Sequence, residues 1–155
     1  MNKLTSSLLG GLAGAVALNV LHQAVKQFAA EAPRVDLVGE EALSKGLEKL
    51  EIDPPKGRKL FAATLAADLI SNAAYYSTIG FGKKKYLLIA GTGAGLAAGI
   101  GAITLPEQMG LNDAPVTKTD TTKLLTVAWY TFGGLVTALT IKALRRERTV
   151  DNDNF

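Results

Sequence analysis

The side chains best suited to chemistry in this sequence are a few polar residues inside long apolar stretches. Asn19, His22 and Lys26 recur at three- and four-residue steps near the end of the first stretch, and Asp68 and Asn72 do so in the second. Each set would lie on one face of a helix. Polar groups at membrane depth carry a free-energy cost, and they mark contacts between helices or paths for protons and ions. These residues are therefore the candidate functional residues.

The two polar faces are expected to meet. The stretches that carry them would be consecutive antiparallel helices, and His22 and Asp68 lie at similar distances from the loop that joins them. We expect His22 to contact Asp68, with Asn19 facing Asn72 deeper in the bundle. Such a contact offsets the cost of burying either group, which favours a structural clasp. A proton or ion path is the alternative.

Motifs for catalysis and cofactor binding are missing from the sequence. It has no cysteine and one histidine, so it offers no thiol nucleophile and no cluster of metal ligands. It has no G-x-S-x-G motif, and Asp68 is the one carboxylate expected well inside the membrane. The sequence therefore predicts a protein that is not an enzyme, with no metal and no cofactor.

Glycines recur at short intervals in residues 87–106, LLIAGTGAGLAAGIGAITLP. The G-T-G-A-G motif suggests dinucleotide binding, but that function requires a preceding strand in a βαβ unit, and this run carries no charge. Small residues on one face of a membrane helix instead let a second backbone approach closely. We expect such packing, within the chain or between chains, at Gly10, Gly14, Gly91, Gly95 and Gly99.

Four apolar stretches must position these residues, at residues 5–30, 59–81, 86–105 and 123–144. Each approaches or exceeds the roughly 20 residues that a helix needs to cross a bilayer. They predict an all-α polytopic membrane protein with four transmembrane helices in an antiparallel bundle, forming a single domain over residues 1–148. A cleaved secretory signal in residues 1–17 and a soluble helical bundle are the alternatives.

The segments between the stretches are expected to lie outside the bilayer. Residues 37–51 carry leucines at helical spacing behind Asp36, which can cap a helix, so they predict a short amphipathic helix in the first loop. This helix would lie on the membrane surface, cover the bundle or dock a partner. Residues 149–155 are expected to be disordered.

Basic residues cluster beside the ends of the apolar stretches. The net charge is a modest +3, and no aromatic residues interleave the clusters, which suits anionic lipid headgroups and argues against nucleic acid. Dense basic clusters favour the cytoplasmic side, so both termini are expected there. The expected partners are the lipid bilayer and other membrane helices. The residues expected at the interface are Arg34, Lys83, Lys84, Lys85, Arg145 and Arg146.

The stretch from residue 22 to residue 43, HQAVKQFAAEAPRVDLVGEEAL, places a late histidine before A-P-R-x-D-x-x-G. This pattern resembles an uncharacterised group of small bacterial inner-membrane proteins. The resemblance implies a bacterial inner-membrane location and assigns no activity. It singles out His22, Pro33, Arg34, Asp36 and Gly39.

Two functions fit these observations. The first is a non-enzymatic accessory or scaffold subunit, or a homo-oligomer, assembled through the glycine-rich helix faces. The second is a small transporter or channel in which Asp68 and His22 line a polar path. Known four-helix multidrug exporters carry their essential carboxylate in the first helix, where this sequence has none.

Overall fold

The computed structural model describes residues 1–145, which form helices joined by turns and short loops, with no strand among them. The prediction of an all-α protein is confirmed. The long helices are α1 (Lys3–Val25), α3 (Arg58–Ser77), α4 (Leu87–Gln108) and α6 (Asp120–Leu144). The shorter elements are α2 (Val35–Lys49) and α5 (Ala114–Thr117), with two 3-10 turns, η1 (Thr78–Phe81) and η2 (Lys84–Tyr86), between α3 and α4.

Each predicted helix is present, with shifted ends. α1 ends at Val25 rather than at residue 30, because the chain leaves the helix and turns ahead of Pro33. The expected cap by Asp36 is wrong, since Arg34 holds the N-cap position of α2 and Asp36 lies in the first turn with its carboxylate bound to other side chains. Arg146 and the predicted disordered tail, residues 149–155, lie outside the described residues.

Within residues 1–145, three helices are long and apolar enough to cross a membrane, namely α1, α4 with η2, and α6. Their outer faces expose large apolar side chains such as Leu12, Ile89 and Leu139. These features are those of a membrane protein. α3 was also predicted to span, but it is not among the three, because Thr64, Asp68 and Asn72 lower its mean hydropathy.

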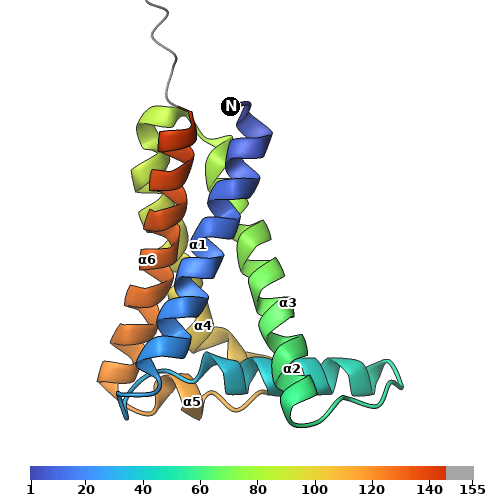
Figure 1. The fold of residues 1–155 in the computed structure, drawn as a ribbon. Coiled ribbons are helices and arrows are strands. Elements are labelled where there is room, and N and C mark those ends of the chain that lie inside the picture. Colours follow the sequence, from blue (N-terminus) through green and yellow to red (C-terminus); the bar gives the residue numbers. More distant parts are fainter. Residues whose placement is uncertain (146–155) are drawn as a thin grey trace, which may run out of the picture.

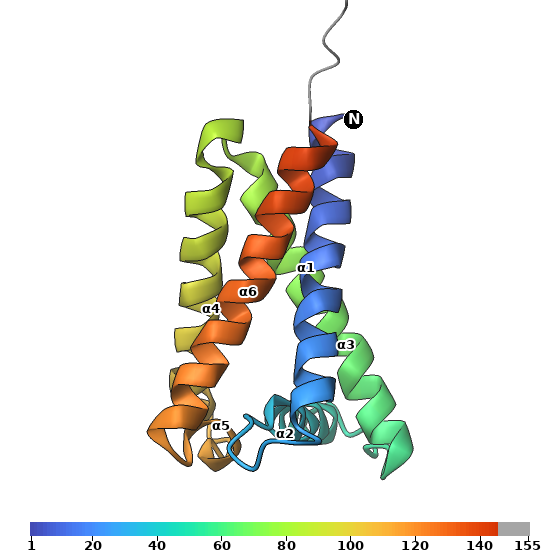
Figure 2. The ribbon, with the colours of Figure 1, turned by 60° about the vertical axis from the view of Figure 1, so that its left-hand side comes forward.

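The long helices stand in the order α3, α1, α6 and α4 around an incomplete ring (Figures 1 and 2). α1 packs along both α3 and α6, and α4 packs along α6. Within residues 1–145, α3 and α4 are not a packed pair, and they separate from their shared hairpin toward the opposite end. α2 lies across that opposite end, roughly perpendicular to the long helices (Figure 1).

Glycines bring α4 against α6. A Cβ atom added at Gly95 would lie 2.5 Å from Thr131 Cα, and one added at Gly99 would lie 2.6 Å from Val127 Cα. Gly91 is equally close to the α6 backbone. The close contact expected of this face is therefore made inside one chain, with α6 as the partner.

Glycines also bring α1 against its two neighbours. Gly10 and Gly14 face α6, where a Cβ atom at Gly14 would lie 2.5 Å from the Gly133 carbonyl oxygen. Gly11 faces α3 and would meet the Ala73 carbonyl. The glycines of α1 and α4 thus make α6 the centre of the packing.

Arg145 ties the end of α6 to the start of α1 and to η1 near the hairpin. Its guanidinium donates to Ser6 Oγ at 2.7 Å, to Ser7 Oγ at 2.9 Å and to the Gly80 carbonyl at 2.6 Å. Its own carbonyl accepts from Lys84 Nζ at 2.9 Å. Arg145 was expected to contact lipid headgroups, and its guanidinium also joins α1, η1 and α6, because their hydroxyl and carbonyl oxygens surround it.

The α4–α6 contact can be tested with two alanine variants. Gly95→Ala should lower the stability by about 1–3 kcal/mol, because its Cβ atom would overlap the α6 backbone. Gly93→Ala is the matched control, since nothing lies within 4 Å of that position, and it should be neutral or slightly stabilising. Thermal unfolding in detergent measures both, and equal stabilities would contradict the contact.

Candidate functional site

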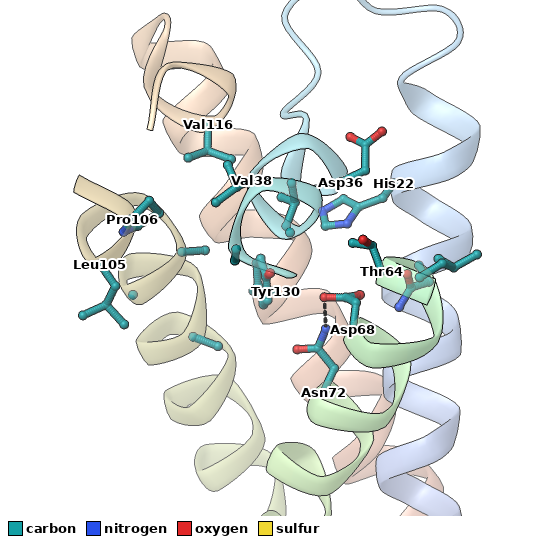
Figure 3. A pocket seen from close by; sticks show the side chains of 18 of the residues that line it. His22, Asp36, Val38, Thr64, Asp68, Asn72, Leu105, Pro106, Val116 and Tyr130 are labelled. Carbon is teal, nitrogen blue, oxygen red and sulfur yellow. Dashed lines mark hydrogen bonds between the residues drawn. The ribbon is translucent and has the colours of Figure 1, made fainter. Parts of the chain in front are cut away.

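The described residues form a prominent, laterally open pocket where α3 and α4 diverge, with a volume of about 490 Å³ (Figure 3). We call it the α3–α4 pocket. α1, α3, α4 and α6 supply its walls, and α2 covers the end away from the hairpin. It is only partly enclosed, and the exposed side chains along its rim include Tyr75 of α3 and Ala97 and Leu105 of α4. The pocket therefore opens sideways, between α3 and α4.

Polar side chains gather on the α1 and α3 walls. His22 from α1 and Thr64, Asp68 and Asn72 from α3 all line the pocket (Figure 3). Asn72 Nδ2 donates to Asp68 Oδ1 at 2.9 Å. Asn19 also lines the pocket, and its amide donates to the Ala15 carbonyl of its own helix. The two predicted polar faces thus border one cavity.

The predicted clasp between His22 and Asp68 is not formed. Asn72, one helical turn from Asp68 on the same helix, occupies one oxygen of the carboxylate. His22 instead packs on aromatic rings of α6, with its ring centroid 4.9 Å from that of Trp129 and 5.9 Å from that of Tyr130. The two groups that the sequence pattern had paired both border the pocket without contacting each other.

Two buried polar atoms of the pocket lack a hydrogen-bond partner in the described part of the chain. They are His22 Nε2 and Thr64 Oγ1. His22 is 7% exposed and Thr64 is 5% exposed, so bulk water does not satisfy them. Leaving a buried polar atom unpaired costs about 1–3 kcal/mol. Both residues line the pocket, and because the two atoms themselves are covered, a bound molecule would reach them through rotation of the side chains.

The α4 wall is apolar and built from small residues. Ala98, Gly101 and Ala102 leave space that larger side chains would fill, and Leu105 and Pro106 continue the wall toward α2. On the hairpin side the α3–α4 gap is bridged by a hydrogen bond from Tyr75 Oη to the Ala94 carbonyl at 2.9 Å. The pocket therefore has a polar wall on one side and an apolar wall on the other.

An ion-pair cluster holds α2 against the end of α1. Asp36 accepts from Lys26 Nζ at 3.1 Å and from Arg34 at 2.8 and 2.9 Å. Burial opposes ionisation of Asp36, but the hydrogen bonds from Arg34 and Lys26 prevail and hold its pKa below the ordinary value of 3.8. The same contact raises the pKa of Arg34. Gly39 lets α2 approach α3, because a Cβ atom there would lie 2.8 Å from Thr64 Cγ2.

Other residues expected at a site take structural or surface positions. Lys26 was expected on the intramembrane polar face, but it does not line the pocket and is neutralised by Asp36. Arg34 pairs with the same carboxylate. Lys83, Lys84 and Lys85 are exposed at the hairpin, where basic residues were expected to meet lipid headgroups. Residues 1–145 contain no cluster of metal-ligating side chains.

Sequence reasoning missed the apolar half of the pocket. Val38 and Ala42 of α2, Ala98 of α4 and Tyr130 of α6 all line it. The sequence did contain one indication of the pocket. Ala98, Gly101 and Ala102 lie beside the glycine face of α4, and their small side chains leave a second shallow face on that helix. Nothing in the local pattern indicated which helix would stand opposite.

Comparison of the chain with protein-family models, with curated proteins and with solved structures found no match. The geometry of the pocket is therefore the basis for a functional proposal.

The role of Asp36 predicts a pH-dependent stability. Because the folded pKa of Asp36 is depressed, its stabilisation is fully present above pH 3.8 and is lost as the pH falls through the lower folded pKa. Asp36→Asn should lower the stability by about 1–3 kcal/mol at neutral pH, and the difference from wild type should shrink in strong acid.

Thermal unfolding in detergent across this pH range tests the prediction. Glu48→Gln is the control, since Glu48 is exposed on the same helix and has no ion pair within residues 1–145. An Asp36→Asn variant as stable as this control at neutral pH would contradict the role assigned to the cluster.

Proposed function

We propose that this chain is a non-enzymatic integral membrane protein that takes a small apolar molecule from the bilayer into the α3–α4 pocket. Its role would be that of an accessory subunit that holds or presents this molecule. The observation that carries the proposal is the pair of buried, unpartnered atoms, His22 Nε2 and Thr64 Oγ1, in the wall of a cavity open toward the side. Binding sites for small molecules combine an apolar lining with a few such polar groups.

In this proposal α3 is a fourth membrane span. α1 and α4 both run from the end that holds the hairpin toward the end covered by α2. If both cross the bilayer, the chain between them must return across it, and α3 is the helix that does so. Its 20 residues correspond to about 30 Å. Its exposed positions support a lipid-facing surface, since they include Ala62, Ala66, Ile70 and Ala74.

This proposal differs from the function expected from the sequence, in which the glycine-rich helix faces join separate subunits. The glycines expected to join subunits pack within the chain, against α6 and α3. This packing supports a helix bundle that needs no second copy to bury those faces. The partners of the protein would then be lipid and other membrane helices, which would contact the outer apolar surface of the bundle.

The proposed location is a bacterial inner membrane with both termini in the cytoplasm. Met1 and Arg145 lie at the same end of the molecule as Lys83, Lys84 and Lys85. Such a concentration of positive charge favours the cytoplasmic side.

Reporter fusions test this topology. A cytoplasm-active reporter fused after residue 145 should be active, and a periplasm-active reporter at the same place should be inactive. The reverse pattern would overturn the orientation, and activity of both would indicate dual topology.

Transport is the second candidate function, and Asp68 favours it. Its carboxylate lies in the pocket wall with one oxygen bound to Asn72. A transported cation or proton would bind there. Proton or cation flux through wild-type protein in vesicles, abolished by Asp68→Asn, would favour transport over a holding role.

Photo-crosslinking in vesicles tests pocket binding. A long-chain alcohol with a diazirine in its tail should label pocket residues such as Phe61 and Leu105. Gly101→Leu should reduce this labelling several-fold, because Gly101 lines the pocket and its nearest neighbour is Leu105 Cδ1, 3.4 Å from an added Cβ atom.

Gly93→Leu is the matched control. It adds the same side chain to α4 at a position that has no neighbour within 4 Å and does not line the pocket. Labelling restricted to outer side chains such as Leu12 and Leu139, and equal in both variants, would overturn the proposed function.

A further inference from the structure

Asp68 is a carboxylate in the pocket wall that has no cation beside it. Asn72 donates to its Oδ1 atom, but residues 1–145 place no lysine, arginine or histidine within ion-pair distance. Asp36 of α2, which lines the same pocket, is paired with Lys26 and Arg34. Asp68 is therefore the carboxylate of the pocket that has no cationic partner in the described residues. A charge in surroundings of low dielectric constant is stabilised strongly by a counter-ion.

The two unpartnered atoms belong to His22 and Thr64, which line the adjoining α1 and α3 walls together with Asp68. Thr64 precedes Asp68 by four residues on α3, so their side chains share a face, and His22 approaches from α1 (Figure 3). A hydroxyl oxygen accepts hydrogen bonds, and so does one nitrogen of a neutral imidazole. Together with the carboxylate they offer three acceptors. A protonated primary amine presents three N–H donors and a positive charge.

The rest of the pocket suits the apolar part of a ligand. Its volume of about 490 Å³ falls within the roughly 300–1,000 Å³ of small-molecule sites. The apolar α4 wall includes Ala98, Gly101 and Ala102, and the opening lies between α3 and α4. An apolar chain can thus extend from the polar wall into the bilayer.

We propose, building on the pocket-binding function above, that the ligand of the α3–α4 pocket is a cationic amphiphile, an apolar molecule with a protonated amine that pairs with Asp68. Thr64 Oγ1 and His22 Nε2 accept its remaining N–H groups. A fatty acid or a phosphate headgroup would instead place a negative charge beside Asp68. Lys26 and Arg34 share the single carboxylate of Asp36 at the α2 end of the pocket, and neither forms an ion pair with Asp68.

Two matched probes test the ligand class. One is the diazirine-bearing long-chain alcohol used above, and the other is the primary amine with the same tail. Labelling of the pocket is divided by labelling of the lipid-facing residues Leu12 and Leu139, which corrects for partition into the vesicle. The amine should label wild-type protein about tenfold more than the alcohol does, as expected for a close charge pair.

Asp68→Asn keeps the shape of the side chain and removes its charge. It should abolish the preference for the amine and leave labelling by the alcohol unchanged. Thr64→Val should reduce labelling by the amine less than Asp68→Asn does, because the carboxylate remains. If Asp68→Asn does not fold, competition in the wild-type protein decides: unlabelled amine should displace the amine probe at about tenfold lower concentration than the equivalent unlabelled alcohol.

The outcomes separate the two proposals. Equal pocket labelling by both probes in wild type and in Asp68→Asn would overturn the cationic ligand and leave pocket binding intact. Failure of both probes to label the pocket would overturn the proposed function itself.

Discussion

The close approach of α1 and α4 to α6 is the constraint on which the rest of the structure depends. Gly14 meets the α6 backbone from one side and Gly95 meets it from the other, so the three helices form a tight layer. In lipid the hydrophobic effect does little to hold helices together, and close backbone packing takes its place. α3 attaches to this layer mainly through α1. The position of α6 therefore leaves α3 and α4 apart and creates the pocket between them.

The polar residues of α3 fit this asymmetry. A helix surrounded by lipid would expose Thr64, Asp68 and Asn72 at high cost, but here Thr64 and Asn72 are buried and Asp68 is half-buried on the side facing α1 and the pocket. Alanines occupy much of the opposite face. The helix thus combines a low average hydropathy with a lipid-compatible outer surface, which is why its sequence is less apolar than those of α1, α4 and α6.

The sequence predicted local features well and partners poorly. Helix positions followed from runs of apolar residues, and the glycine faces followed from four-residue spacing, because both patterns are contained in one segment. The pairing of His22 with Asp68 failed because depth along antiparallel helices says nothing of rotation about their axes, and Asn72 and the aromatic rings of α6 offered nearer partners. For a similar reason the sequence did not predict the contacts within the protein made by Arg145. Its acceptors, Ser6 and Gly80, are distant in sequence and come together only in the folded chain.

The arrangement around the pocket bears on the choice between holding and transport. Toward the hairpin, Tyr76 donates to the Tyr130 carbonyl at 2.7 Å and Tyr75 donates to the Ala94 carbonyl, so α3 is tied to α6 and α4 there. Toward the other end, α2 covers the pocket and is fixed by the Asp36 ion pairs and by a hydrogen bond from the Arg34 amide to the Pro115 carbonyl at 2.9 Å. The remaining access is lateral, between α3 and α4. A transporter must expose its site to each side of the membrane in turn, which here would require breaking one of these two sets of contacts. A holding protein needs neither change, since its ligand enters and leaves through the bilayer, and this geometry is the physical reason for preferring that role.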